Sequence, residues 1–216
     1  MAGRLPPVDP TLVRAGIAVA VAYLLGSLPM GVIVAAVTGG VDPRTVGSGR
    51  TGGNNALRAM GPSRAAVVFA LDVAKGAAAV LVARLLDADP PLEAVAGTVA
   101  IFGAWRSVFL RFGGGRGVAT GIGGLLLIDP LATLFAAPIA LGAIVVSRYV
   151  SLGSLLGSAA AGLIVVAFIA LGLLQPGYVG FAVAGPLLIW AAHADNIDRI
   201  LHGRERRFSG LRGSPP

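Results

Sequence analysis

Long apolar runs alternate with short polar segments along most of this chain. The runs are Leu12–Val37, Ala65–Leu86, Leu92–Trp105, Val118–Ile128, Leu131–Val146, Leu155–Leu174 and Tyr178–Ala192. About 20 apolar residues in a helix cross a bilayer. The pattern therefore predicts an all-α integral membrane protein, a bundle of seven transmembrane helices within residues 12–192 and one polytopic domain over residues 1–216. A kink is expected at Pro29, and the short fourth run is expected to enter the membrane from a glycine-rich, partly re-entrant loop.

Composition supports the membrane assignment and excludes several other classes. Of the 216 residues, 56% are hydrophobic and 12% are charged, and the mean hydropathy is +0.84. Soluble domains carry about 25% charged residues. The chain has no cysteine, which excludes disulfides and thiol chemistry. Its net charge of +7 lies in short loops between apolar runs rather than on one soluble face, so we expect no nucleic-acid partner.

Arginines gather in alternate polar segments. Residues 39–64, 106–117, 148–154 and the basic tail 193–216 carry most of the 16 arginines, whereas the polar segments between them hold only three arginines against five acidic residues. Because basic loops stay on the cytoplasmic side, this pattern predicts a cytoplasmic C-terminus and an N-terminus outside. The basic, glycine-rich loops would then share one cytoplasmic face.

The segment Gly47–Arg58, GSGRTGGNNALR, has the composition of a phosphate-binding loop. Its glycines allow tight turns and close approach to a ligand, and consecutive backbone N–H groups in such turns can form an anion site. Arginine supplies a fork that matches phosphate oxygens. The candidate ligand-binding residues in this loop are Ser48, Gly49, Gly52, Asn54, Asn55 and Arg58.

Two later segments add similar chemistry. The loop of residues 106–117 ends in GGGRG directly before an apolar run, and a glycine-rich loop at a helix N-terminus binds anions. Its candidates are Gly114, Gly115, Arg116 and Gly117, and the polar turn at residues 148–154 adds Ser154. His193 and Asn196 would share a helical face, and histidine is the common acid or base near neutral pH.

One further charged pair lies inside an apolar run. Asp72 and Lys75 are three residues apart and would be neighbours on one helical face. Ionisable residues within a membrane are costly unless they are paired or functional. We interpret the pair as a structural ion pair that faces the bundle.

These motifs resemble those of the acyl-phosphate-dependent glycerol-3-phosphate acyltransferases, the PlsY family. GSGRTGGNNALR is similar to the first motif, GGRGVAT to the end of the second and HADNI to the third. RYVSLGS resembles the family's RYVSLxS, and LDVAKG resembles its LDxxKG. The sequence departs from the family at Arg50, where the family usually has Asn, and at Ala104, where it has His. Gly53 and Asn54 also differ from the family's Ala and Thr.

The resemblance implies an activity in phospholipid synthesis. An acyl chain would move from acyl phosphate to the 1-hydroxyl of glycerol 3-phosphate in a bacterial cytoplasmic (inner) membrane, giving lysophosphatidic acid and phosphate. The implied catalytic residues are Ser48, Arg58, His193 and Asn196. The remaining candidates, from Gly49 to Ser154, would bind the substrates. Because an acyl phosphate is already activated, no metal or other cofactor is expected.

Other hypotheses remain open from the sequence. The departures at Arg50, Asn54 and Ala104 suggest a diverged paralogue with another acceptor. A transporter or non-catalytic scaffold is a second class, although the paired broken helices of two repeated halves are not evident. Neither a P-loop nor a dinucleotide-binding fingerprint is present, which argues against a soluble nucleotide-binding enzyme. The sequence does not fix an oligomeric state.

Overall fold

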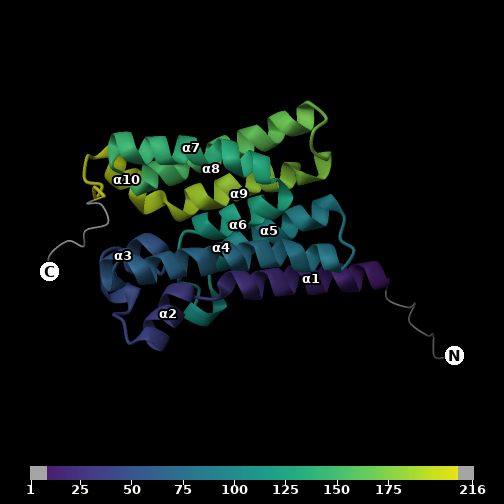
Figure 1. Cartoon of the computed structure of the whole chain (residues 1–216). Helices are drawn as coiled ribbons and strands as arrows, with labels where there is room; N and C mark the ends of the chain where they lie inside the picture. The colour runs from purple at the N-terminus through teal and green to yellow at the C-terminus, as the bar shows by residue number, and fades with distance from the viewer. Residues whose placement is uncertain (1–8, 209–216) are drawn as a thin grey trace.

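The computed structural model describes residues 9–208, and the regular structure in that range is helical. Figure 1 shows the elements in order. They are α1 (Pro10–Ser27), α2 (Met30–Thr38), η1 (Pro43–Thr45), α3 (Gly53–Met60), α4 (Pro62–Leu85), α5 (Pro90–Trp105), η2 (Val108–Leu110), α6 (Val118–Ile128), α7 (Pro130–Ser147), α8 (Val150–Ala170), η3 (Pro176–Tyr178), α9 (Val179–Ala192) and α10 (Ala194–Leu201).

Aspartate–proline signals set several helix starts. The side chains of Asp9, Asp89 and Asp129 accept hydrogen bonds from backbone N–H groups in the first turns of α1, α5 and α7. Each is followed directly by a proline at the first helical position, where the missing N–H costs nothing. Side-chain caps therefore fix the starts of these three helices.

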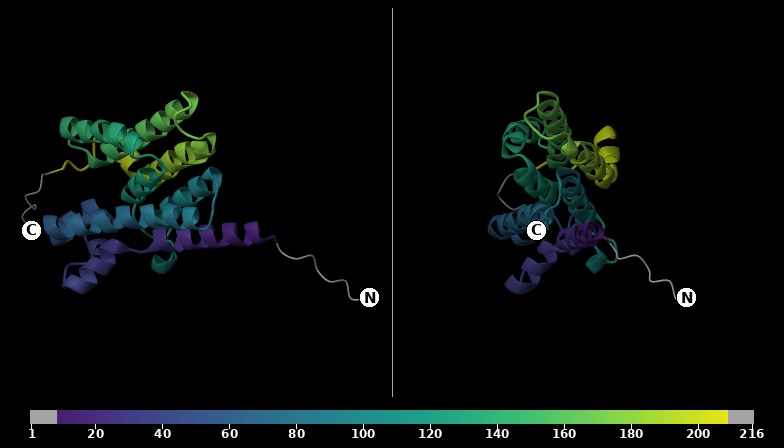
Figure 2. Two further views of the ribbon diagram at one scale, coloured as in Figure 1. Left: turned by 45° about the vertical axis from the view of Figure 1, so that its right-hand side comes forward. Right: turned by 90° about the vertical axis from the view of Figure 1, so that its right-hand side faces the viewer.

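The helices form a bundle whose layers are seen in Figures 1 and 2. Helices α7, α8 and α9 lie on one side, α4, α5 and α6 lie in the middle, and α1 runs along α4 and α5. Glycines bring α4 and α6 very close together. A Cβ atom built on Gly76 would lie 1.9 Å from the Thr120 carbonyl oxygen, and one on Gly123 would lie 1.9 Å from that of Val73. Such backbone contact is typical of helix packing in membranes.

The membrane assignment is confirmed by helix length and polarity, while the count of seven spans stays a prediction. Within residues 9–208, the helices α1, α4, α7 and α8 are each long and apolar enough to cross a bilayer. The segment Pro176–Ala192 together with α10 forms a fifth candidate, bent by 64°. The short helix α6 is apolar, and its entry into the membrane from a partly re-entrant loop stays a prediction.

Two expected boundaries are wrong. The run 12–37 was predicted as one kinked helix, but α1 ends at Ser27 and α2 starts at Met30. Proline lacks the N–H that a continuous helix requires and disfavours helical geometry in the residue before it, so Pro29 breaks the helix instead of kinking it. The polar turn was predicted over residues 148–154, but α8 already starts at Val150.

A partly buried polar cluster connects four elements at one end of the bundle. Arg84 in α4 donates to both carboxylate oxygens of Glu93 in α5, at 3.0 and 2.7 Å. The hydroxyl of Tyr178 in η3 donates to the same carboxylate at 2.9 Å. Arg84 also donates to the Leu127 carbonyl oxygen at the end of α6. This cluster fixes the end of the bundle opposite α3 and α10 (Figure 1).

Candidate active site

A polar cavity of about 520 Å³ lies at the end of the bundle where α3 and α10 meet the first turns of α6 and α8. It brings together segments that are far apart in the sequence. Most of the predicted site residues line it: Ser48, Gly52, Asn54, Asn55, Arg58, Gly115, Arg116, Gly117, Ser154, His193 and Asn196. Gly49 and Gly114 do not. The three polar loops therefore form one site.

Asn55 fixes the conformation of the loop that precedes α3, which we call the first loop. Its side-chain nitrogen lies 2.5 to 2.9 Å from the carbonyl oxygens of Pro43, Val46 and Arg50, and its oxygen accepts from the backbone N–H of Ser48 at 3.3 Å. Asn55 was predicted to bind substrate. Since its amide is fully used by these backbone groups, its contribution in this structure is to hold the loop that presents Ser48.

The two predicted glycines outside the cavity shape its loops instead. Gly49 has φ +68°, in the left-handed region that side chains disfavour. Gly114 has φ +159°, and a Cβ atom there would lie 2.5 Å from the Ala104 carbonyl oxygen. Close packing against the end of α5 explains why this position is a glycine.

The loop of residues 106–117, which we call the second loop, places Arg116 in the wall of the cavity. The backbone N–H of Gly115 donates to the Ala104 carbonyl oxygen at 2.8 Å, and Gly117, at φ +73°, is the N-cap residue directly before α6. Arg116 forms an ion pair with Asp195 of α10, with an N–O distance of 2.9 Å. The Nε atom of Arg116 is buried and makes no hydrogen bond within residues 9–208. One donor of this guanidinium is therefore available to a ligand.

His193 lies at the junction of α9 and α10, and its side chain is buried. Its Nδ1 atom is 2.7 Å from the Ile189 carbonyl oxygen. Because a carbonyl oxygen only accepts, Nδ1 carries the proton and Nε2 carries the lone pair. Burial, assisted by the charge of Arg116, lowers the pKa of His193 to about 4. The ring is thus neutral near pH 7 and can accept a proton at Nε2.

Sequence reasoning missed Glu205, which lies in the tail that was predicted to be only basic and polar. Its carboxylate accepts from the Ser151 hydroxyl at 3.0 Å, from Asn196 Nδ2 at 2.8 Å and from Arg199 Nε at 2.9 Å. Arg199 also pairs with Asp195 at 3.0 Å. The only sequence signal is a single acid within the stretch RERR. Glu205 joins α8 to α10 at the cavity wall.

The predicted ion pair between Asp72 and Lys75 is present, with an N–O distance of 2.7 Å. Lys75 also donates to the Leu28 carbonyl oxygen, 2.8 Å away, at the break between α1 and α2. Both side chains line the polar cavity. The pair therefore faces the site as well as the bundle.

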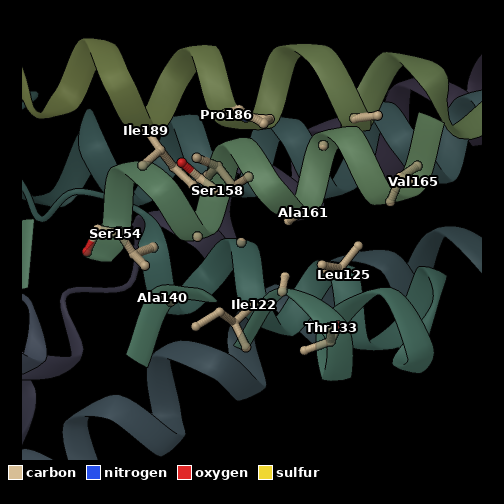
Figure 3. A pocket seen from close by; sticks show the side chains of 18 of the residues that line it. Ile122, Leu125, Thr133, Ala140, Ser154, Ser158, Ala161, Val165, Pro186 and Ile189 are labelled. Carbon is tan, nitrogen blue, oxygen red and sulfur yellow. The ribbon is translucent and has the colours of Figure 1, made fainter. Parts of the chain in front are cut away.

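An apolar cavity of about 130 Å³ lies next to the polar one, between α6, α7, α8 and α9 (Figure 3). The two cavities share Val118 and Ser154 as lining residues. In Figure 3, Ser154 lies at one end of the cavity and Val165 at the other. A helix rises 1.5 Å per residue, so these two residues are about 16 Å apart along α8. That length is close to half of a hydrocarbon core of about 30 Å.

Comparison with known proteins gives consistent matches over most of the chain. The family described as glycerol-3-phosphate acyltransferase matches residues 16–203. A glycerol-3-phosphate acyltransferase of Thermus thermophilus is 46% identical over 188 residues, which cover 87% of this chain and 92% of that protein. Another, the glycerol-3-phosphate acyltransferase 1 of Deinococcus radiodurans, is 37% identical over 194 residues, covering 89% and 94% of the two chains.

Two solved structures share the fold. Both are crystal structures of PlsY, an integral membrane glycerol 3-phosphate acyltransferase. The glycerol 3-phosphate form has a TM-score of 0.82 and 36% identity, and the lysophosphatidic acid form has a TM-score of 0.81 and 35% identity. In each case the match covers 91% of this chain and 96% of the other.

Proposed function

Because the chain belongs to the glycerol-3-phosphate acyltransferase family, we propose that it transfers an acyl chain from an acyl phosphate to the 1-hydroxyl of glycerol 3-phosphate. The observation that carries this proposal is that the two cavities are adjacent and share lining residues. A polar cavity rich in arginine meets an apolar cavity at Val118 and Ser154. A substrate with a phosphate group next to an acyl carbonyl and a long apolar tail fits across that junction.

The polar cavity would hold the two phosphate groups. Arg58 and Arg116 supply guanidinium groups, which match phosphate oxygens in geometry and charge. Ser48 and Asn196 add neutral hydrogen-bonding groups, and the Oδ1 atom of Asn196 is buried without a partner among the described residues. Holding two anionic substrates close and aligned supplies much of the rate increase in such a transfer.

The reaction needs one proton acceptor and no external activation. The 1-hydroxyl oxygen attacks the acyl carbonyl carbon, the bond from that carbon to the phosphate oxygen breaks, and inorganic phosphate leaves. His193 presents a neutral imidazole with a free Nε2 lone pair, which suits it to take the hydroxyl proton. The phosphate group of a substrate is the other possible acceptor. Arg116 and Arg58 would stabilise the departing phosphate.

The apolar cavity would receive the acyl tail. It is lined by small and aliphatic side chains of α6, α7, α8 and α9, among them Ala140, Ala161 and Ile189 (Figure 3). Its length along α8 corresponds to the acyl region of one leaflet. The tail would thus stay in an apolar environment during the reaction.

The arrangement also supports a membrane orientation. The helix α1 starts at the end of the bundle opposite α3 and α10 (Figure 1). The arginine-rich loops and the polar cavity lie together at the latter end. By the positive-inside rule, we place the cavity on the cytoplasmic side of the bacterial inner membrane and residue 10 on the outer side.

The test is a reaction of purified protein with acyl phosphate and glycerol 3-phosphate, followed by detection of lysophosphatidic acid and phosphate. Acyl-CoA and acyl-carrier protein serve as competing donors. We expect product from acyl phosphate and none from the other two. Product from acyl-CoA alone would contradict the proposed donor, and transfer only to another acceptor would support the diverged paralogue.

A further inference from the structure

The polar cavity holds more positive charge than its acidic side chains neutralise. Six cationic and three acidic residues line it or contact its wall, and several of them are paired. Lys75 pairs with Asp72, Arg116 pairs with Asp195, and Arg199 pairs with Asp195 and Glu205. Within residues 9–208, no ion pair involves Arg50, Arg58 or Arg206. Of these, Arg50 lies in a loop whose backbone is tightly fixed.

The backbone at Arg50 is held beside the second loop. Its carbonyl oxygen accepts from the Asn55 side chain at 2.9 Å. The next residue, Thr51, is buried and touches the second loop: a Cβ atom built on Gly115 would lie 3.5 Å from Thr51 Oγ1 and 3.6 Å from the Ala104 carbonyl oxygen. Arg50, Thr51, Ala104 and Gly115 all line the same cavity.

The positive charge of Arg50 affects the ionisation of Asp195, which contacts that wall of the cavity. Burial alone would raise the pKa of the Asp195 carboxyl, but the charges of Arg116, Arg199 and Arg50 hold it below its usual range. No carboxylate lies within ion-pair distance of Arg50 itself in the described part of the chain. The guanidinium therefore has its hydrogen-bond donors free at the point where the two loops meet.

We propose that Arg50 binds the phosphate group of glycerol 3-phosphate, next to the Gly115–Gly117 loop. This inference rests on the proposed function, and it names a specificity residue that the family motif does not contain, since the usual residue at this position is Asn. Ala104, where the family has His, lies on the same wall and offers only a methyl group. Arg50 thus supplies a donor on a wall where this chain lacks the imidazole.

Arg44 provides a matched control in the same loop. Its guanidinium is engaged by Asp42, with an N–O distance of 2.7 Å, and it does not line the cavity. Arg50→Asn and Arg44→Asn remove the same charge. A general effect of net charge on anion binding would lower affinity in both variants, whereas a direct contact would lower it only at Arg50.

The experiment measures binding of glycerol 3-phosphate alone by calorimetry, using the full-length protein in detergent micelles. We expect Arg50→Asn to weaken binding about tenfold, as for the loss of one charge-assisted hydrogen bond. Arg44→Asn should stay within about twofold of the unmodified protein. In turnover, Arg50→Asn should raise the KM for glycerol 3-phosphate and leave that for acyl phosphate nearly unchanged.

A second variant tests the link to Ala104. Adding Ala104→His to Arg50→Asn should recover a large part of the lost affinity, because both positions would face the same phosphate. Equal affinities of the Arg50→Asn and Arg44→Asn proteins, or a larger change in the KM for acyl phosphate, would overturn the role of Arg50 while transfer by the unmodified protein persisted. An unmodified protein that neither binds glycerol 3-phosphate nor forms lysophosphatidic acid would instead overturn the proposed function as well.

Discussion

The ammonium group of Lys75 in α4 donates to the backbone carbonyl oxygen of Leu28, 2.8 Å away, at the break between α1 and α2. The same group is paired with Asp72 at 2.7 Å, and both side chains are nearly buried. The break that Pro29 creates is therefore held by a charge in the neighbouring helix. This places α2, where a Cβ atom on Gly31 would touch the Thr51 carbonyl oxygen, against the first loop.

Removing only the lysine should be more harmful than removing both charges. Lys75→Met would leave the Asp72 carboxylate buried and unpaired, at a cost of about 3–5 kcal/mol. We expect a large drop in thermal stability in detergent, and Asp72→Leu combined with Lys75→Met should recover much of it. If the double variant is as unstable as the single one, the contact with Leu28 rather than the unpaired charge determines the loss.

Asn55 should be sensitive to exchange of its amide for a carboxylate. Asn55→Asp keeps the size but removes two N–H donors, which are shared among three carbonyl oxygens and contribute about 1 kcal/mol each. We expect the first loop to become susceptible to limited proteolysis and kcat to fall by at least tenfold. Asn54→Asp, one residue earlier, should keep the protease resistance because no loop hydrogen bond involves the Asn54 side chain in the described structure. Equal cleavage of both variants would contradict this role of Asn55.

Arg58 should be required for turnover but not for folding. It lines the polar cavity on α3 and forms no ion pair within residues 9–208. Losing a charged hydrogen bond to phosphate costs about 1.5–3 kcal/mol, so Arg58→Ala should lower kcat/KM roughly tenfold to a few hundredfold. Arg64→Ala is the control, since Arg64 donates to the Thr38 carbonyl oxygen outside the cavity. Near-normal kinetics of Arg58→Ala would remove this residue from the site.

His193 should remain neutral well below pH 6.5, its ordinary pKa, because burial lowers the pKa to about 4. The sign follows from that shift: the unfolded chain would take up the proton first, so acidification from about pH 6.5 toward 4 should destabilise the fold. The chain has two histidines, so NMR titration of labelled His202→Gln protein reports His193 alone. A midpoint near pH 6.5 would contradict the buried, neutral ring.

The sequence was sufficient for the motif residues but not for the contacts that hold them. Ser48, Arg116 and His193 could be assigned to one site because their polar segments alternate with apolar runs. That alternation predicts that all three segments lie on the same side of the membrane. Glu205 could not, because a single acid in an arginine-rich tail has no spacing signature, and its role depends on how α10 folds back. Asn55 was expected in a loop, but it lies in α3. Only the structure shows that its amide is taken up by backbone carbonyl groups of the preceding loop.

The break at Pro29 illustrates a different limit. Proline inside an apolar run is compatible with either a kinked helix or two helices. The outcome depends on whether a neighbouring group can satisfy the exposed backbone, and here Lys75 does so from a helix more than forty positions away in the chain. Local pattern therefore located the irregularity but not its geometry.

The apolar cavity can be tested by filling it from α9. A Cβ atom on Gly185 would lie 3.4 Å from Ile101 Cδ1, an ordinary contact, so Gly185→Val should fold while its methyl groups enter the cavity. Displacing about two methylene groups of a bound tail would cost roughly 1.6 kcal/mol, or a rise of roughly fifteenfold in the KM for long-chain acyl phosphates. Short-chain acyl phosphates should be affected less. Gly180→Val, on the same helix but with open space around it and outside the cavity, should change neither value. If both variants give the same chain-length profile as the unmodified protein, the acyl tail does not occupy this cavity.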